Sequence, residues 1–192
     1  MQSGMSPARA LEQLKEGNER FLSGKLLSRD YSGEISETAG GLFPFAAILG
    51  CIDSRASAEQ LFDQGVGDLF NARVAGNIVN EDILGSLEYA CNVAGAKLIL
   101  VLGHTACGAV TAATQRVELG NITTLLSKIT PVVDRLDKDL AVDEVAEHNV
   151  RHSMERIRKE SSILKEMELE GKILIKGAMY DVATGEVRFL GD

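Results

Sequence analysis

The fold is decided by the stretch FAAILGCIDSR, residues 45–55. Phe45 to Leu49 is a short, continuous apolar run, which is typical of a strand buried on both faces of a parallel sheet. Cys51 follows the run directly, and a carboxylate (Asp53) and a guanidinium (Arg55) come next. A soft metal ligand and a possible ion pair therefore stand at the carboxyl end of a buried strand.

Strand and helix patterns alternate along the chain after this stretch. Ser57 with Gln60 resembles a capping box that opens a helix through about Gln64, and Gly95 is placed to end a later helix. We expect further strands over 68–74 and 97–102, and helices over 81–94 and from about 107 onward. This order predicts an α/β fold with a mainly parallel central sheet flanked by helices, whose ligands gather at the carboxyl ends of the strands.

The two ends of the chain add to this core. Ser6-Pro7 predicts the start of an amphipathic helix that ends at Gly24 and is followed by a polar linker over 25–40. We expect this N-terminal helical arm to reach away from the core and to pack on a second subunit. Near the other end, strand patterns over 173–180 and 186–190 are joined by a turn, which predicts a C-terminal antiparallel hairpin.

A chain of 192 residues suits a single domain. We divide 1–192 into an N-terminal helical arm and linker (1–40), an α/β core with the metal site (41–120), a charged helical region (121–170) and terminal strands (171–192).

Composition excludes several classes of function. The formal net charge is -8 with 45% hydrophobic residues, so we expect a folded acidic protein that does not bind nucleic acid. Met1 to Gly4 are too few and too polar for a signal peptide, and no apolar run approaches the ~20 residues needed to cross a bilayer. The three cysteines match no disulfide framework, so we expect reduced thiols in the cytoplasm and no membrane role.

A metal site is indicated by two separate segments. His104 and Cys107 are three residues apart where a loop enters a helix, and Cys51 joins them if the two strands are neighbours. Two thiolates and an imidazole, with no fourth Cys or His close by, are the ligands of a catalytic zinc site with one position open. The helix N-terminus should favour the thiolate of Cys107.

Asp53 and Arg55 have a chemical role beside such a site. Two thiolates neutralise the charge of Zn²⁺, so the ion acidifies a bound water less than one held by three histidines. Asp53 can accept the proton of a zinc-bound hydroxide and orient it, and Arg55 can keep Asp53 ionised. In an extended segment, Cys51, Asp53 and Arg55 point to the same side.

Other chemically suggestive residues have simpler interpretations. Cys91 lies on the apolar stripe of its helix and is interpreted as a core residue. His148 and His152 are four apart, but their neighbours are typical of a solvated helix face. Gly65-Val66-Gly67 lacks the third glycine of a dinucleotide fingerprint and is interpreted as a turn.

Taken together, the motifs resemble the β-class carbonic anhydrases. The segments, in order, are Cys51-x-Asp53-x-Arg55, Arg73-Val74-Ala75-Gly76-Asn77, His104-x-x-Cys107 and Tyr180-Asp181-Val182-Ala183-Thr184-Gly185. The resemblance implies reversible hydration of CO₂ to bicarbonate and a proton, with zinc on Cys51, His104 and Cys107. It also implies a homodimer or homotetramer, and a role for Asp53 as a conditional fourth zinc ligand when Arg55 releases it.

The resemblance also suggests a substrate pocket that includes Phe70 and Tyr89, near a subunit interface. Leu42 stands where the family commonly has a glutamine that hydrogen-bonds substrate. Ile48 replaces a tryptophan found in members with a noncatalytic bicarbonate site, so we do not expect that site here.

Two alternatives stay open at this point. A hydrolase acting on carbonyl sulfide or carbon disulfide could use the same metal site, because these linear electrophiles differ from CO₂ mainly in the pocket shape they need. A noncatalytic, zinc-stabilised binding or assembly protein is the alternative from another class; Leu42 favours it and the intact Asp53-Arg55 pair disfavours it.

Overall fold

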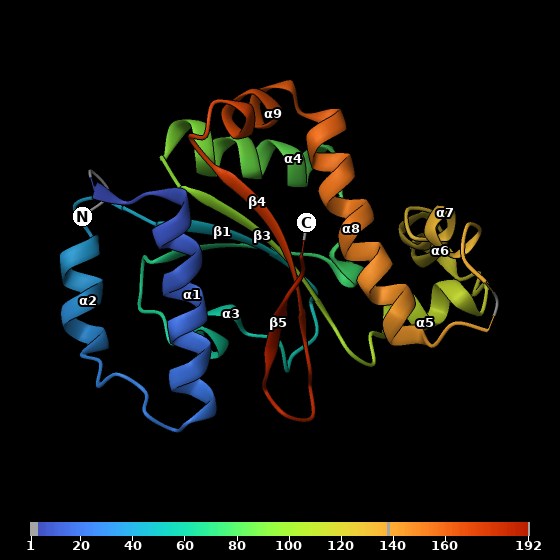
Figure 1. Ribbon diagram of the computed structural model, residues 1–192, viewed down its shortest axis with the longest axis horizontal. Helices are drawn as coiled ribbons and strands as arrows, with labels where there is room; N and C mark the ends of the chain where they lie inside the picture. The colour runs from blue at the N-terminus through green and yellow to red at the C-terminus, as the bar shows by residue number, and fades with distance from the viewer. Residues whose placement is uncertain (1–3, 138, 192) are drawn as a thin grey trace.

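The computed structural model describes residues 4–137 and 139–191; residues 1–3, on which part of the expectation about a signal peptide rests, lie outside them. Within the described residues, five strands form one sheet in the order β2-β1-β3-β4-β5 (Figure 1). Their bounds are β1 Ala46–Gly50, β2 Leu69–Arg73, β3 Leu98–His104, β4 Leu174–Tyr180 and β5 Val187–Phe189. The first four are parallel and β5 is antiparallel to β4, which confirms the predicted α/β sheet and its terminal hairpin.

Helices cover both faces of the sheet. Alternate strand residues point to opposite faces, so Ile48 packs in one apolar cluster and Leu49 in another. The cluster around Ile48 includes residues of α1 (Pro7–Leu22) and α3 (Ala58–Leu61). The cluster around Leu49 includes residues of α4 (Glu81–Glu88), α8 (Val142–Glu160) and α9 (Ser162–Leu169).

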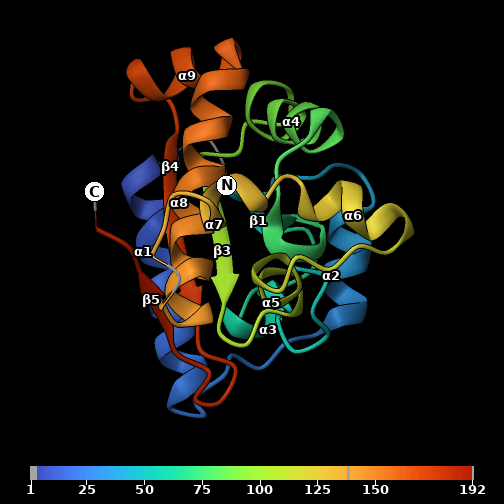
Figure 2. The ribbon, with the colours of Figure 1, turned by 90° about the vertical axis from the view of Figure 1, so that its right-hand side faces the viewer.

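The longest helix, α8, lies close against β3 and β4. Figure 2 shows it running along the sheet, with α4 and α9 near one end and α5 (Gly108–Thr114) near the other. Gly103 on β3 makes this approach possible, because a Cβ atom there would lie 2.5 Å from Cγ2 of Val150 and 2.8 Å from Sδ of Met179.

Short elements complete the chain. These include α6 (Gly120–Leu126), α7 (Thr130–Val133), a 3₁₀ turn over Ala75–Asn77 and a π-helical turn over Tyr89–Val93 that continues α4. The helix predicted over 81–94 is therefore present, and Gly95, with φ of 85°, ends it.

The expectation that the first helix reaches away from the core is wrong. Ala10 and Leu14 of α1 are fully buried against the chain's own sheet. Asn18 on the same helix donates to the carbonyl oxygens of Leu61 and Gly185 and accepts from the backbone N–H of Val187. These contacts join α1 to the core and to the terminal hairpin.

The predicted linker over 25–40 contains a helix, α2 (Tyr31–Thr38), whose N-cap Asp30 accepts from the backbone N–H of Gly33. No residue within Tyr31–Thr38 is buried. A helix that buries no side chain needs no apolar stripe, so the sequence gave no pattern from which to predict it.

The helix predicted through Gln64 is shorter than expected. It ends at Leu61, and Ser57 makes no side-chain capping bond to the described residues, so the predicted capping box is wrong. Two residues further on, Asp63 is left-handed, with φ of 47°, which is incompatible with a continuing helix. In the described part of the chain, no helix combines the length and apolar character needed to span a bilayer.

Candidate metal centre

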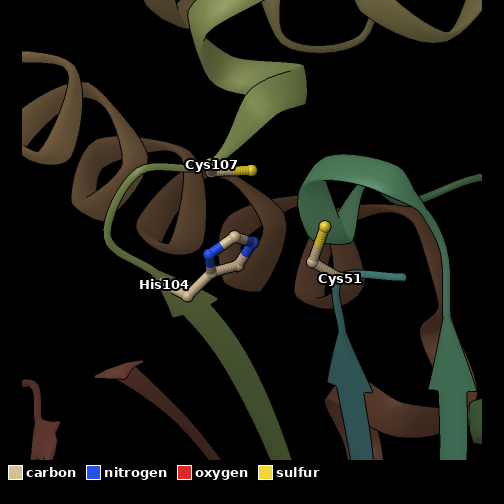
Figure 3. Close-up of side chains that lie close together, drawn as sticks. All are labelled: Cys51, His104 and Cys107. Atoms are coloured by element: carbon tan, nitrogen blue, oxygen red, sulfur yellow. The ribbon is translucent and has the colours of Figure 1, made fainter. Parts of the chain in front are cut away.

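Three side chains, from the ends of two neighbouring strands and the start of a helix, meet at one edge of the sheet. Cys51 follows β1, His104 ends β3, and Cys107 is the N-cap residue of α5. Because β1 and β3 are adjacent and parallel, with Gly50 opposite Leu102, their carboxyl ends lie together. The ligand atoms of the three residues all lie within 4.8 Å of one another, and each residue is buried (Figure 3).

The orientation of His104 suits a metal. Its Nδ1 lies 2.9 Å from the carbonyl oxygen of Thr105. Since a carbonyl only accepts, Nδ1 carries the proton and Nε2 presents a lone pair. Nε2 is buried and has no hydrogen-bond partner among the described residues. A buried nitrogen without a partner, beside two sulfur atoms, is what a metal-binding imidazole presents when its other nitrogen is held by the backbone.

The protonation of the thiols differs from the sequence-based expectation for Cys107. The closeness of the two sulfur atoms lowers the pKa of Cys51 and raises the pKa of Cys107. The backbone N–H groups of Ala109 and Val110 lower the pKa of Cys107, as the helix N-terminus predicts, but the neighbouring sulfur outweighs them. A metal cation would displace the proton of Cys107 and hold both sulfur atoms as thiolates.

The donor set agrees with zinc chemistry. Two sulfur atoms and one imidazole nitrogen form the group, and within the described residues no further Cys, His, Asp or Glu joins it. Zinc takes nitrogen and sulfur ligands, and three protein ligands leave a fourth position for water or substrate. The residues therefore fit a zinc ion with an open position.

Asp53 and Arg55 form a bidentate pair next to this group. Nε–H of Arg55 donates to Oδ1 of Asp53 at 2.9 Å, and Nη2 donates to Oδ2 at 2.8 Å. The Arg55 hydrogen bonds hold the pKa of the Asp53 carboxyl far below its usual range. The pair forms in a turn rather than in the expected extended segment, because the N–H of Ala56 donates to the carbonyl oxygen of Asp53.

Arg73, at the end of β2, supports the segment from the other side. Its Nε donates to the carbonyl oxygen of Cys51 at 2.9 Å, and its Nη2 donates to that of Asp53 at 2.6 Å. Arg73 lies opposite Gly50 in the β1–β2 register. Sequence reasoning placed Arg73 in a motif but gave it no contact, because the register of neighbouring strands is not visible in one sequence.

The loop between His104 and Cys107 is held in place by α8. Ala106 is left-handed, with φ of 53°, and its N–H donates to Oδ1 of Asp143 at 2.7 Å. A left-handed alanine is strained, so its conformation depends on contacts of this kind. Asp143 belongs to the charged helical region over 121–170, for which the sequence predicted no contact with the site.

Phe70 and Tyr89 lie together, but away from the metal group of the same chain. Their ring centroids are 6.2 Å apart with the rings at 76°, and both line a cavity of about 540 Å³. The described lining of this cavity includes none of the three metal-binding candidates. Tyr89 and Leu42 are about half exposed, and Ile48 is buried within β1.

Cys91, His148 and His152 lie outside the metal-binding group. Cys91 is buried in the apolar core, and burial raises the pKa of its thiol to about 12, which confirms a packing role. His148 is exposed, whereas His152 is partly buried; neither joins a candidate metal group among the described residues.

Most of the chain is similar to known proteins. A family model described as carbonic anhydrase matches residues 46–187. Carbonic anhydrase 2 of Mycobacterium tuberculosis is 37% identical over 190 residues, covering 94% of this chain and 91% of the relative.

Solved structures give the same result. The β-carbonic anhydrase CafA of Aspergillus fumigatus has a TM-score of 0.76 and 26% identity, covering 95% of this chain and 89% of its own. The Coccomyxa β-carbonic anhydrase, solved in complex with acetazolamide, has a TM-score of 0.73 and 29% identity, covering 94% and 84%. With the Cys-His-Cys group at the end of its parallel strands, this chain belongs to the β-class carbonic anhydrase family.

Proposed function

We propose that this protein catalyses the zinc-dependent, reversible hydration of CO₂ to bicarbonate and a proton. One observation carries the proposal: the buried group Cys51, His104 and Cys107 has no fourth protein ligand among the described residues and lies beside the bidentate Asp53–Arg55 pair. A structural zinc site would be closed by a fourth protein ligand.

Zinc bound at this group supplies a Lewis-acid centre that makes water a better nucleophile at neutral pH. Cys51, His104 and Cys107 would hold the ion, with His104 using Nε2. Asp53 accepts a hydrogen bond from the attacking water and orients a lone pair toward the carbon of CO₂. Arg55 keeps the Asp53 carboxylate ionised and in one orientation, so that the water is held in the geometry needed for attack. If the ion pair with Arg55 breaks, Asp53 would become the conditional fourth ligand.

Substrate would be held by apolar side chains. We assign Phe70 and Tyr89 to a substrate pocket at an interface between subunits, because the exposed Tyr89 ring and the cavity beside it are separate from the metal group of their own chain. This assignment requires more than one subunit, and we propose that the protein forms a homodimer or homotetramer. Reduced thiols at the site suit the cytoplasm, and we propose that residues 1–192 act as one domain.

The decisive experiment is stopped-flow CO₂ hydration by zinc-loaded and metal-free protein from near-neutral to alkaline pH. We expect a zinc-dependent rate that acetazolamide inhibits. The absence of a zinc-dependent rate at every pH would overturn the enzymatic proposal and favour a binding or assembly protein. Carbonyl sulfide and carbon disulfide offered in parallel test the hydrolase alternative, which faster turnover of either substrate would support.

A further inference from the structure

The core-facing stripe of α8 contains two buried polar residues. Asn149 is 1% exposed and Ser153 is 2% exposed, and they lie one turn apart between the apolar residues Val145 and Ile157. A buried amide or hydroxyl is costly unless it is hydrogen-bonded. Their positions therefore require an explanation that apolar packing does not supply.

Both side chains bind the same distant turn. Nδ2 of Asn149 donates to the carbonyl oxygen of Gly76 at 2.8 Å, and Oγ of Ser153 donates to that of Asn77 at 3.0 Å. These carbonyls belong to successive residues, more than 70 positions away in the sequence. One face of α8 thus holds the backbone that follows β2.

The turn is unusual in its backbone. Gly76 has φ of 67° and Asn77 has φ of 43°, so two successive residues are left-handed. A Cβ atom on Gly76 would lie 2.6 Å from Cδ1 of Ile129. This conformation points the N–H of Gly76 at Sγ of Cys51, 3.3 Å away. The Gly76 N–H belongs to the Ala75–Gly76 peptide and the Gly76 carbonyl to the next peptide, and the two planes meet at the Gly76 Cα. Because glycine rotates freely about φ and ψ, a hydrogen bond that fixes the Gly76 carbonyl restricts the rotation that would turn its N–H away from sulfur.

We propose that Asn149 is a positioning residue for the metal centre: it holds the Gly76 carbonyl and thereby keeps the Gly76 N–H on the Cys51 sulfur. This rests on the proposed function, in which Cys51 is a metal ligand. Hydrogen bonds to a coordinating sulfur withdraw electron density from it and tune the metal. With two thiolates in the ligand set, such a bond makes the metal a stronger Lewis acid than the sulfur atoms alone would allow.

The test uses cobalt-loaded protein, in which the sulfur-to-metal charge-transfer band reports electron density on the thiolates. Asn149→Leu removes the amide at similar volume, and Ser153→Ala is the matched control from the same stripe. Ser153 binds the Asn77 carbonyl, which is one peptide further from the Gly76 N–H than the carbonyl that Asn149 binds. We expect a shift of the band to lower energy in Asn149→Leu and a wild-type band in Ser153→Ala.

A wild-type band in folded, cobalt-loaded Asn149→Leu would overturn the proposal, as would equal shifts in both variants. If Asn149→Leu does not fold, Asn149→Ala is used instead, because it removes the amide and adds no methyl groups. The same criterion then applies to its charge-transfer band. A second measurement uses the unaltered protein loaded with the NMR-active isotope of cadmium. We expect scalar coupling between the Gly76 amide proton and the metal through the sulfur, and its absence would also overturn the proposal.

If the proposed function is wrong, the cobalt experiment gives a different result from the one that contradicts the role of Asn149. If the wild-type protein binds no cobalt, or if a Cys51→Ser variant keeps an unchanged charge-transfer band, Cys51 is not a ligand and the metal centre itself is wrong. If the wild type shows the band and the Asn149 variants show the same band at the same energy, Cys51 remains a metal ligand and Asn149 does not position the metal centre.

Discussion

Arg55 gives the Asp53 carboxylate three hydrogen bonds. Nε and the backbone N–H of Arg55 both donate to Oδ1 at 2.9 Å, and Nη2 donates to Oδ2 at 2.8 Å. The Asp53 side chain is 18% exposed and that of Arg55 is 49% exposed, so solvent screens the pair on one side. The value of the contact therefore lies in orientation more than in stability.

Arg55→Lys tests this orientation. Lysine keeps the positive charge but presents a single ammonium in place of the planar fork, so it cannot hold both carboxylate oxygens. We expect roughly 10- to 100-fold slower CO₂ hydration with zinc content unchanged, the usual size of an effect from a residue that orients a metal site. Turnover is measured by stopped flow and metal by elemental analysis. A variant with wild-type turnover would show that charge alone suffices.

Asp53→Ala removes the orienting carboxylate itself. The metal-binding group does not include Asp53, so zinc should stay bound. Turnover should fall by about 100-fold or more, which is the range for loss of a positioned proton acceptor. Loss of zinc from this variant would instead make Asp53 a ligand at rest, and unchanged turnover would remove it from the mechanism.

The Asp53 carboxyl should not titrate in the physiological range. Arg55 lowers its pKa, so the contribution of the pair to stability is complete above the unfolded value of ~3.9 and is lost as pH falls through the lower folded value. We expect its carboxyl carbon resonance to stay constant between about pH 5 and 9. In Arg55→Gln the midpoint should move up toward ~3.9. A wild-type midpoint above that value would contradict the pairing.

Cys107→Ala and Cys91→Ala form a matched pair of buried thiol deletions. Cys107 belongs to the metal-binding group and Cys91 to the apolar core. We expect Cys107→Ala to lose stoichiometric zinc and CO₂ hydration. Cys91→Ala should keep both and lose about 1 kcal/mol of unfolding free energy, as a small core truncation does. Retention of stoichiometric zinc by Cys107→Ala would exclude Cys107 as a ligand.

Gly76→Ala should damage the turn that faces Cys51. Alanine is disfavoured at a φ of 67°, and its Cβ would lie 2.6 Å from Cδ1 of Ile129. We expect a loss of about 1–3 kcal/mol in urea unfolding, together with weaker zinc binding. Gly85→Ala in α4 is the control, because nothing lies within 4 Å of the added Cβ, and it should not destabilise the helix. Equal effects of the two substitutions would show that the Gly76 turn has no special constraint.

Much of the fold follows from local patterns. The apolar run before Cys51 and the run before His104 each predict a buried parallel strand, and both are present as β1 and β3. Continuous apolar character is a local property that a sheet covered on both faces imposes on its strands. The misses have the same cause: α2 buries no side chain and so shows no stripe, and the polar residues of α1 gave no sign that Asn18 is buried.

By itself, the sequence determined the types and order of the chemical groups: two thiols, one imidazole, and an aspartate two residues before an arginine. Tertiary structure alone decided that Cys51 and His104 are neighbours, that Arg73 holds the carbonyl of Cys51, and that Asn149 reaches Gly76. The physical reason is distance along the chain. Strand register and helix packing bring together groups that are tens of residues apart, and no periodicity within one segment records which distant backbone atom its side chains will meet.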